Sequence, residues 1–251
     1  MTNVHDKSTH FGYQTVNEHD KTEKVAQVFK NVAPRYNVMN DLMSLGLHRL
    51  WKQRAILETD IKKGHTVLDL ASGTGDLVKL MVKKVGETGC IYMTDINEAM
   101  LTVGRDRLID QGILHPIQFM LVDAESIPLP DLSCDRVTIA FGLRNVTHKE
   151  QALREMHRVL KPGGKLMVLE FSKPVTKVLA SVYDAYSFSV IPKLGQFILN
   201  DAASYQYLVE SIRMHPDQDS LAALMREAGF EDVAYRNLTG GIVAIHTGWK
   251  Y

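Results

Sequence analysis

Residues 67–77 read VLDLASGTGDL and contain the clearest structural signal in the chain. It starts as an apolar strand, turns at Gly73 and Gly75, and leads into a helical pattern over 76–85. Glycine removes the Cβ atoms where a ligand must approach the backbone. The helix that follows offers free N–H groups and the positive end of its dipole. The stretch therefore predicts a ligand site at the carboxyl end of a strand. The alternative is a tight loop that needs glycine only for its own geometry.

Strands and helices alternate outward from this turn. Strands are expected at 66–70, 90–94, 117–122, 136–141 and 165–171, with helices at 76–85, 97–110 and 149–160. Such alternation predicts right-handed crossovers and a mainly parallel sheet with helices on both faces. The tail differs, because a helix at 219–228 precedes two strand-like segments, 231–237 and 242–247, joined by Thr-Gly-Gly. That short link predicts an antiparallel hairpin, so the fold class is α/β.

The remaining segments flank or interrupt this pattern. Residues 1–21 are polar and are expected to form a mobile arm, whose three histidines lack a metal-ligand spacing. Residues 22–60 predict two or three short helices that form a cap. Residues 61–251 then form the main domain, with the apolar stretch at about 174–215 inserted as a helical lid. No metal is expected.

Composition excludes several classes of protein. Lys+Arg and Asp+Glu are equal at 29 each, whereas proteins that coat nucleic acid carry a basic excess. Two cysteines, Cys90 and Cys134, are too few for a disulfide framework, which favours a reducing cytoplasm. The longest charge-free stretch, 237–249, has 13 residues, and a membrane-spanning helix needs about 20. We therefore expect a cytoplasmic protein with no nucleic-acid partner.

An acidic residue stands where a nucleoside ligand would need one. Asp95 comes 20 residues after Gly75, at the expected tip of the second strand, where a carboxylate can accept hydrogen bonds from both ribose hydroxyls. The glycine turn and Asp95 together favour a ligand site over a loop that needs glycine only for its own geometry. A dinucleotide site would prefer a third glycine at position 78, which is Val78 here.

Two further acids decide between the cofactor classes. Asp69 ends the first strand, where a carboxylate repels a pyrophosphate but suits an ammonium group. Asp123 follows the third strand and can accept a hydrogen bond from an adenine amino group, while small Ala124 leaves room for the ring. Three acids around one crevice favour a cationic ligand, which indicates S-adenosylmethionine.

Four stretches carry a resemblance to a known family. They are residues 36–51 (YNVMNDLMSLGLHRLW), 141–146 (FGLRNV), 158–172 (RVLKPGGKLMVLEFS) and 211–219 (SIRMHPDQD). Through them the chain resembles, over essentially its whole length, the class I S-adenosylmethionine-dependent methyltransferases. It resembles the ubiquinone/menaquinone biosynthesis C-methyltransferases most closely, although Asn37 stands where that family usually has Asp.

The resemblance implies a Rossmann-like, seven-stranded sheet whose last strand is antiparallel. It implies C-methylation of a polyprenyl methoxy-benzoquinol and of demethylmenaquinol. It also implies cofactor contacts at Thr74, Asp95, Asp123, Ala124 and Ala140. Relatives often carry Asn at position 123 and Ser at position 140. Aspartate still accepts an adenine N–H bond, whereas alanine offers only backbone and packing contacts.

Arg144 and Asn145 follow the fourth strand and are the candidate catalytic residues. Arg144 could lower the pKa of a phenolic acceptor or hold a water that takes its proton. It could equally fix the loop by donating to backbone carbonyls. Glu170 ends the fifth strand and could face the substrate or cap a loop.

The substrate is expected to have a polar aromatic head and a long apolar tail. Its candidate contacts are Tyr36, Asn40, His48, Tyr183, Tyr186, Arg213 and His215. For His48 a packing role is at least as well supported. The lid could line a groove for the tail or touch a membrane surface at its inner face. Transient contacts with other quinone-biosynthesis proteins and an oligomeric state stay open.

Three other functions compete with this interpretation. A nicotinamide-dependent oxidoreductase is disfavoured by the missing third glycine and by the acidic crevice. A non-catalytic quinone-binding protein would bind the cofactor without turnover. An RNA methyltransferase is disfavoured by zero net charge.

Overall fold

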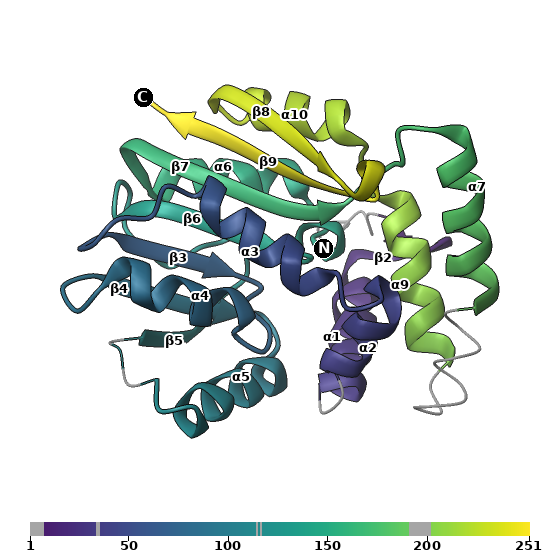
Figure 1. Ribbon diagram of the computed structural model, residues 1–251, viewed down its shortest axis with the longest axis horizontal. Coiled ribbons are helices and arrows are strands. Elements are labelled where there is room, and N and C mark those ends of the chain that lie inside the picture. Colours follow the sequence, from purple (N-terminus) through teal and green to yellow (C-terminus); the bar gives the residue numbers. More distant parts are fainter. Residues whose placement is uncertain (1–7, 34–35, 114, 116, 191–201) are drawn as a thin grey trace, which may run out of the picture.

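The computed structural model describes residues 8–33, 36–113, 115, 117–190 and 202–251, and its centre is a twisted sheet (Figure 1). Its strands are β3 (Thr66–Leu70), β4 (Cys90–Asp95), β5 (Ile117–Leu121), β6 (Cys134–Ala140), β7 (Leu160–Phe171), β8 (Glu231–Leu238) and β9 (Val243–Lys250). In the described part of the chain these seven strands lie in the order β5-β4-β3-β6-β7-β9-β8. β9 pairs antiparallel with both β7 and β8. The α/β class and the C-terminal antiparallel hairpin are confirmed.

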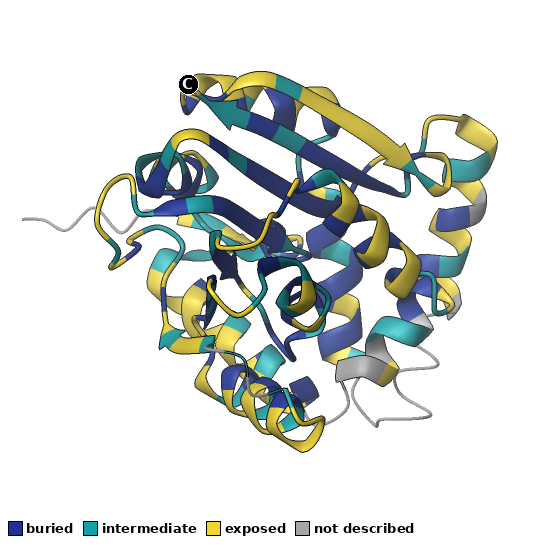
Figure 2. Ribbon diagram, turned by 60° about the vertical axis from the view of Figure 1, so that its left-hand side comes forward, coloured by how far each residue is buried: buried dark blue, intermediate teal, exposed yellow. Residues whose placement is uncertain are grey.

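Helices cover both faces of the sheet because each inner strand is apolar on both sides. Along β7, Met167 and Leu169 belong to the core beneath α3 (His48–Glu58), α4 (Asp76–Val85) and α5 (Glu98–Asp110). Leu166 and Val168 belong to the opposite core, beneath α6 (Lys149–Val159) and α10 (Gln218–Glu227). The period of two along a strand produces this division. Figure 2 shows the inner strands buried, with exposed residues along the outer helix faces and along β8.

β7 begins earlier than the sequence predicts. The sequence predicts a helix up to residue 160 and a strand from residue 165, but β7 starts at Leu160. Cys134 pairs with Leu160 and Arg136 pairs with Lys165, so the Lys-Pro-Gly-Gly segment bulges out of the ladder. Proline has no N–H to donate to a ladder, and Gly163 has a φ of +77° that suits glycine.

The beginning of the chain packs over the carboxyl ends of the parallel strands. It forms the hairpin strands β1 (Ser8–Phe11) and β2 (Gln14–Asn17), and then α1 (Glu18–Val32) and α2 (Tyr36–Ser44). Where a mobile arm was expected, residues 8–17 are thus a hairpin, whose Tyr13 N–H donates to Glu210 Oε2 at 3.0 Å. Figure 1 shows α1, α2 and α9 (Ala202–Met214) gathered beyond the tips of β3 and its neighbours.

The segment expected as a lid is helical over most of its described residues, although 174–176 and 215 are not in a helix. It contains α7 (Lys177–Ala185), a π-helical turn η3 (Tyr186–Val190) and α9, while residues 191–201 lie outside the described residues. Two 3₁₀ turns, η2 (Leu143–Asn145) and η4 (Thr239–Gly241), complete the elements used below. Within the described ranges, no helix has the length and apolar character needed to cross a membrane.

Candidate functional site

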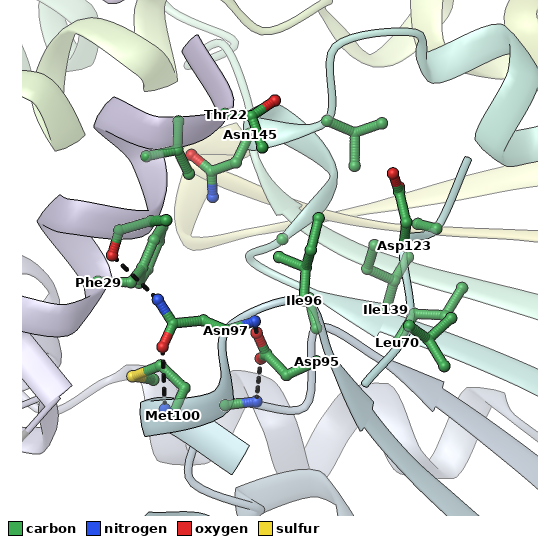
Figure 3. A pocket seen from close by; sticks show the side chains of 18 of the residues that line it. Thr22, Phe29, Leu70, Asp95, Ile96, Asn97, Met100, Asp123, Ile139 and Asn145 are labelled. Atoms are coloured by element: carbon green, nitrogen blue, oxygen red, sulfur yellow. Dashed lines mark hydrogen bonds between the residues drawn. The ribbon is translucent and has the colours of Figure 1, made fainter. Parts of the chain in front are cut away.

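A cavity of about 210 Å³ opens at the carboxyl edge of the sheet (Figure 3). α1 forms one wall, and the other walls are the segments that follow β3, β4, β5 and β6. Residues 71–73, 95–97, 122–125 and 141–147 supply most of these segments. Because parallel strands end at the same edge, four loops distant in the sequence converge on one site.

The Gly-x-Gly turn and Asp95 form one hydrogen-bonded unit. Gly73 and Gly75 adopt φ values of +56° and +78°, which favour glycine. The Gly73 N–H donates to Asp95 Oδ2 at 2.9 Å, and the Asn97 N–H donates to Asp95 Oδ1 at 2.9 Å. Burial raises the pKa of Asp95, and these backbone donors oppose the rise. The carboxylate is therefore held in one orientation on the cavity wall.

Asp69 lies on the other side of the turn, in a smaller cavity of about 20 Å³ that Thr74 and Ala140 also line. Its Oδ1 accepts a hydrogen bond from Thr138 Oγ1 at 2.6 Å, whereas its buried Oδ2 has no partner among the described residues. Burial raises the pKa of Asp69 to about 6. A cationic group at this point would satisfy the free oxygen and favour the ionised carboxylate.

Asp123 and Ala124 line the large cavity on the side of β5. Asp123 is exposed, and its Oδ1 accepts the Glu125 N–H at 2.9 Å. Figure 3 shows Asp123 across the pocket from Phe29, with Ile96 between them. The structure thus brings Gly73, Asp95, Asp123 and Ala124 to one cavity. It places Asp69, Thr74 and Ala140 at the smaller one.

The two candidate catalytic residues occupy different positions. Asn145 lines the large cavity, and its Oδ1 accepts a hydrogen bond from Tyr207 at 2.9 Å. Arg144 is buried behind the loop, where its Nη1 donates to Glu170 Oε1 at 2.8 Å and to the Phe141 carbonyl. The guanidinium also lies over the Phe171 ring, 5.6 Å from its centroid. Arg144 therefore shapes the loop that presents Asn145.

None of the expected substrate contacts whose side chains the structure describes lines the large cavity. The side chain of Tyr36 is outside the described part of the structure, and Asn40 is half-buried on α2. His48 is buried, with Nε2 3.0 Å from Asp41 Oδ1. The contacts expected on the lid also lie elsewhere. Arg213 pairs with Asp184 and lies 5.2 Å from the Tyr183 ring centroid. Tyr186 is half-buried in η3 and His215 is buried just after α9.

Sequence reasoning missed the wall made by α1. Lys21, Val25 and Phe29 line the cavity from this helix. Burial lowers the pKa of Lys21 to about 8, and this lysine makes no ion pair within the described residues. Asn97 donates from Nδ2 to the Ala26 carbonyl at 3.0 Å, which ties the wall to the tip of β4. No local pattern reveals this contact, because 71 residues separate its partners.

A histidine clamp holds the start of the same helix. His148 Nδ1 lies 2.7 Å from Glu125 Oε2, and its Nε2 lies 3.0 Å from Glu18 Oε1. Hydrogen bonding to Glu125 is the largest of the effects that raise the pKa of His148. The clamp joins α1 to the segment after β5, and both of these line the cavity.

Comparisons with known proteins agree with this geometry. The chain is 56% identical over 251 residues, covering all of both chains, to the ubiquinone/menaquinone biosynthesis C-methyltransferase UbiE of Pseudoalteromonas translucida. It is 60% identical over 243 residues to the protein of that name from Ectopseudomonas mendocina, covering 97% of this chain and 95% of that one.

Solved structures share the fold at low sequence identity. An S-adenosylmethionine-dependent methyltransferase from Aquifex aeolicus superposes with a TM-score of 0.62 at 20% identity, covering 86% of this chain and 98% of that one. A phosphoethanolamine N-methyltransferase from Haemonchus contortus, solved with S-adenosyl-L-methionine, has a TM-score of 0.60 at 13% identity and covers 79% of this chain and 52% of that one. A sequence model of the ubiE/COQ5 methyltransferase family matches residues 17–250, and the chain therefore belongs to that family.

Proposed function

We propose that this chain is an S-adenosylmethionine-dependent C-methyltransferase of ubiquinone and menaquinone biosynthesis. Its substrates are a reduced polyprenyl methoxy-benzoquinol, demethylmenaquinol, or both. Identity of 56% along the full length of a relative named for this activity carries the proposal. The acidic cavity at the carboxyl edge of the sheet supports it, because a sulfonium cofactor is cationic.

The residues present fit this cofactor. The fixed carboxylate of Asp95 would accept hydrogen bonds from the ribose hydroxyls, and Asp123 would accept one from the adenine amino group. The unpartnered Oδ2 of Asp69 would accept one from the methionyl ammonium. When bound, S-adenosylmethionine supplies an electrophilic methyl group on a positively charged sulfur.

The protein's part in the reaction is to orient the acceptor and to manage its proton. The ring carbon would take the methyl group as the sulfur–methyl bond breaks to leave a neutral thioether, and the ring carbon would then release its own hydrogen as a proton to restore aromaticity. A phenolic acceptor with a pKa of about 10 becomes a much better nucleophile once it loses its proton. Asn145 faces the cavity and would donate to the phenolate oxygen. Arg144 would hold the loop that carries Asn145, through the Phe141 carbonyl. Exclusion of water by α1 would strengthen both effects.

The inserted segment would accommodate the apolar tail. Val175 and Val178 are 61% and 77% exposed at its start, and single exposed valines of this kind are compatible with an apolar partner. The partner of this segment is the small quinol itself, and we propose in addition that the segment contacts a membrane surface.

The test is incubation of the purified chain with methyl-labelled S-adenosylmethionine and a reduced short-tail demethyl-benzoquinol or demethylmenaquinol. We expect mass spectrometry to find the label on a ring carbon, and Asp95→Ala to abolish it. Asp110→Ala is the matched control, because Asp110 is exposed at the far end of α5. Cofactor binding by calorimetry without any ring methylation would contradict the substrate assignment.

A further inference from the structure

Tyr207 does not line the cavity but contacts Asn145, which does. It lies outside every motif noted in the sequence. It lies on α9, buried, and its hydroxyl is 2.9 Å from Asn145 Oδ1. Its ring stacks on Phe11 of the N-terminal hairpin, with centroids 4.1 Å apart and planes 12° apart. The stacking on Phe11 therefore restricts the orientation of the Tyr207 ring, and its hydroxyl is directed at Asn145.

The hydrogen bond determines which end of the Asn145 amide faces the cavity. Burial raises the pKa of Tyr207 far above its ordinary value, so its hydroxyl stays protonated and needs an acceptor. Asn145 Oδ1 is that acceptor, and the described residues offer the hydroxyl no other. A flipped amide would leave this buried proton without a partner, at a cost that disfavours the flip.

The amide nitrogen is consequently free for a ligand. In Figure 3 the Nδ2 atom of Asn145 points into the pocket, and no described residue accepts from it. Of the polar side chains around the cavity, the acids Asp95, Asp123 and Glu125 cannot stabilise a negative oxygen, whereas Lys21 on α1 and the Asn145 amide carry donors that can. A fixed N–H₂ donor is what a developing phenolate in this cavity would require.

We propose that Tyr207 is a positioning residue for the methyl-transfer step: its hydroxyl holds the Asn145 amide so that Nδ2 faces the cavity and donates an N–H to the phenolate oxygen of the acceptor. This inference rests on the proposed function for the identity of the acceptor. The stacked Phe11 extends the arrangement to the N-terminal hairpin, because it fixes the plane of the Tyr207 ring.

The first test is Tyr207→Phe, which removes the hydroxyl and keeps the ring stacked on Phe11. We expect kcat to fall by about 10- to 100-fold, with the KM for S-adenosylmethionine unchanged within about twofold. The rising limb of the pH–kcat profile should move to higher pH, because a mobile amide lowers the acceptor's pKa less. Tyr235→Phe is the control, since it removes a tyrosine–carboxylate bond to Asp219 on the exposed strand β8.

A double-mutant cycle tests whether Tyr207 affects kcat through Asn145. If Tyr207 acts through Asn145, then Tyr207→Phe should change kcat by less than about twofold in an Asn145→Ala background. A full effect of Tyr207→Phe in that background would overturn the proposal. So would a Tyr207→Phe enzyme with wild-type kcat and pH profile.

A spectroscopic measurement keeps the inference separate from the substrate assignment. In asparagine-labelled protein, the side-chain amide signal that disappears in Asn145→Ala belongs to Asn145. We expect Tyr207→Phe to shift this signal and Tyr235→Phe to leave it in place. An unshifted signal would refute the hydrogen bond whatever the enzyme's substrate is. Absence of ring methylation by the wild type, with the shift observed, would instead count against the proposed function alone.

Discussion

Replacing Arg144 with methionine should lower the stability of the folded protein, whatever its effect on catalysis. The side chains of Arg144 and Glu170 are 3% and 1% exposed, so their ion pair is shielded from water. Methionine removes the guanidinium. The buried Glu170 carboxylate then keeps only two donors, the backbone N–H groups of residues 144 and 171. The Phe141 carbonyl loses its donor as well.

The expected loss follows from that geometry. Removing one partner of a buried pair costs about 3–5 kcal/mol, out of a total stability of roughly 5–15 kcal/mol. For a domain of this size each kcal/mol shifts the unfolding midpoint by about 2–4 °C, so the midpoint should fall by roughly 6–20 °C. Arg49→Met is the matched control. Arg49 is 57% exposed and pairs with Asp41 at the surface, where an ion pair contributes about 0–1 kcal/mol.

Thermal unfolding followed by circular dichroism, with urea titration in parallel, measures the effect. The double variant Arg144→Met/Glu170→Gln removes both charges and should recover half or more of the lost midpoint. A stable double variant without methyl transfer would assign Arg144 a role beyond holding the loop. A midpoint for Arg144→Met within about 2 °C of the wild type would refute the reasoning, because the pair would then contribute no more than a surface one.

Three further outcomes are expected. Because burial raises the folded-state pKa of Asp69 to about 6, ionising it costs stability. The free energy of unfolding should therefore decline as pH rises from about 4 to about 6, and Asp69→Asn should flatten that decline in urea titrations. Because the pKa of His148 is raised, its clamp contributes fully below the pKa of an unfolded histidine and is lost as pH rises through the folded value. Hydrogen exchange in α1, corrected for intrinsic rates, should accelerate over that window in the wild type and not in His148→Gln. A Cβ on Gly104 would lie 2.5 Å from the Gly73 carbonyl oxygen, so Gly104→Ala should weaken cofactor binding about tenfold or more by calorimetry. Gly112→Ala, where no atom lies within 4 Å of the added Cβ, should leave the affinity unchanged.

Short-range patterns were enough to predict the sheet. The alternation around residues 67–77 and the Thr-Gly-Gly link each involve neighbours in the sequence, and they correctly predicted the parallel core and the terminal hairpin. The convergence of Asp95, Asp123 and Asn145 on one cavity follows from the same rule, since parallel strands end at one edge.

The contacts that α1 and α9 make with the site could not be predicted in this way. The bond between Asn97 and the Ala26 carbonyl joins residues 71 apart, and the bond between Tyr207 and Asn145 joins residues 62 apart. Such contacts depend on how helices dock, which no local periodicity encodes. Arg144 illustrates the same point, because only the folded chain shows that its charge is matched by Glu170.

The contacts of the β1–β2 hairpin also limit the order in which parts of the protein can fold during synthesis. Tyr13 bonds to Glu210, 197 residues later, and Trp51 donates to Thr239, 188 residues later. At roughly 5–20 residues per second, the ribosome needs about 10–40 s to make the partner of Tyr13 after Tyr13 itself. During that interval the hairpin has no α9 to pack against, and Phe11 lacks Tyr207. The nascent chain can build β3, β4 and their turn early, but Tyr207 and Glu210, which hold Asn145 and the hairpin, are made only after every residue that lines the cavity.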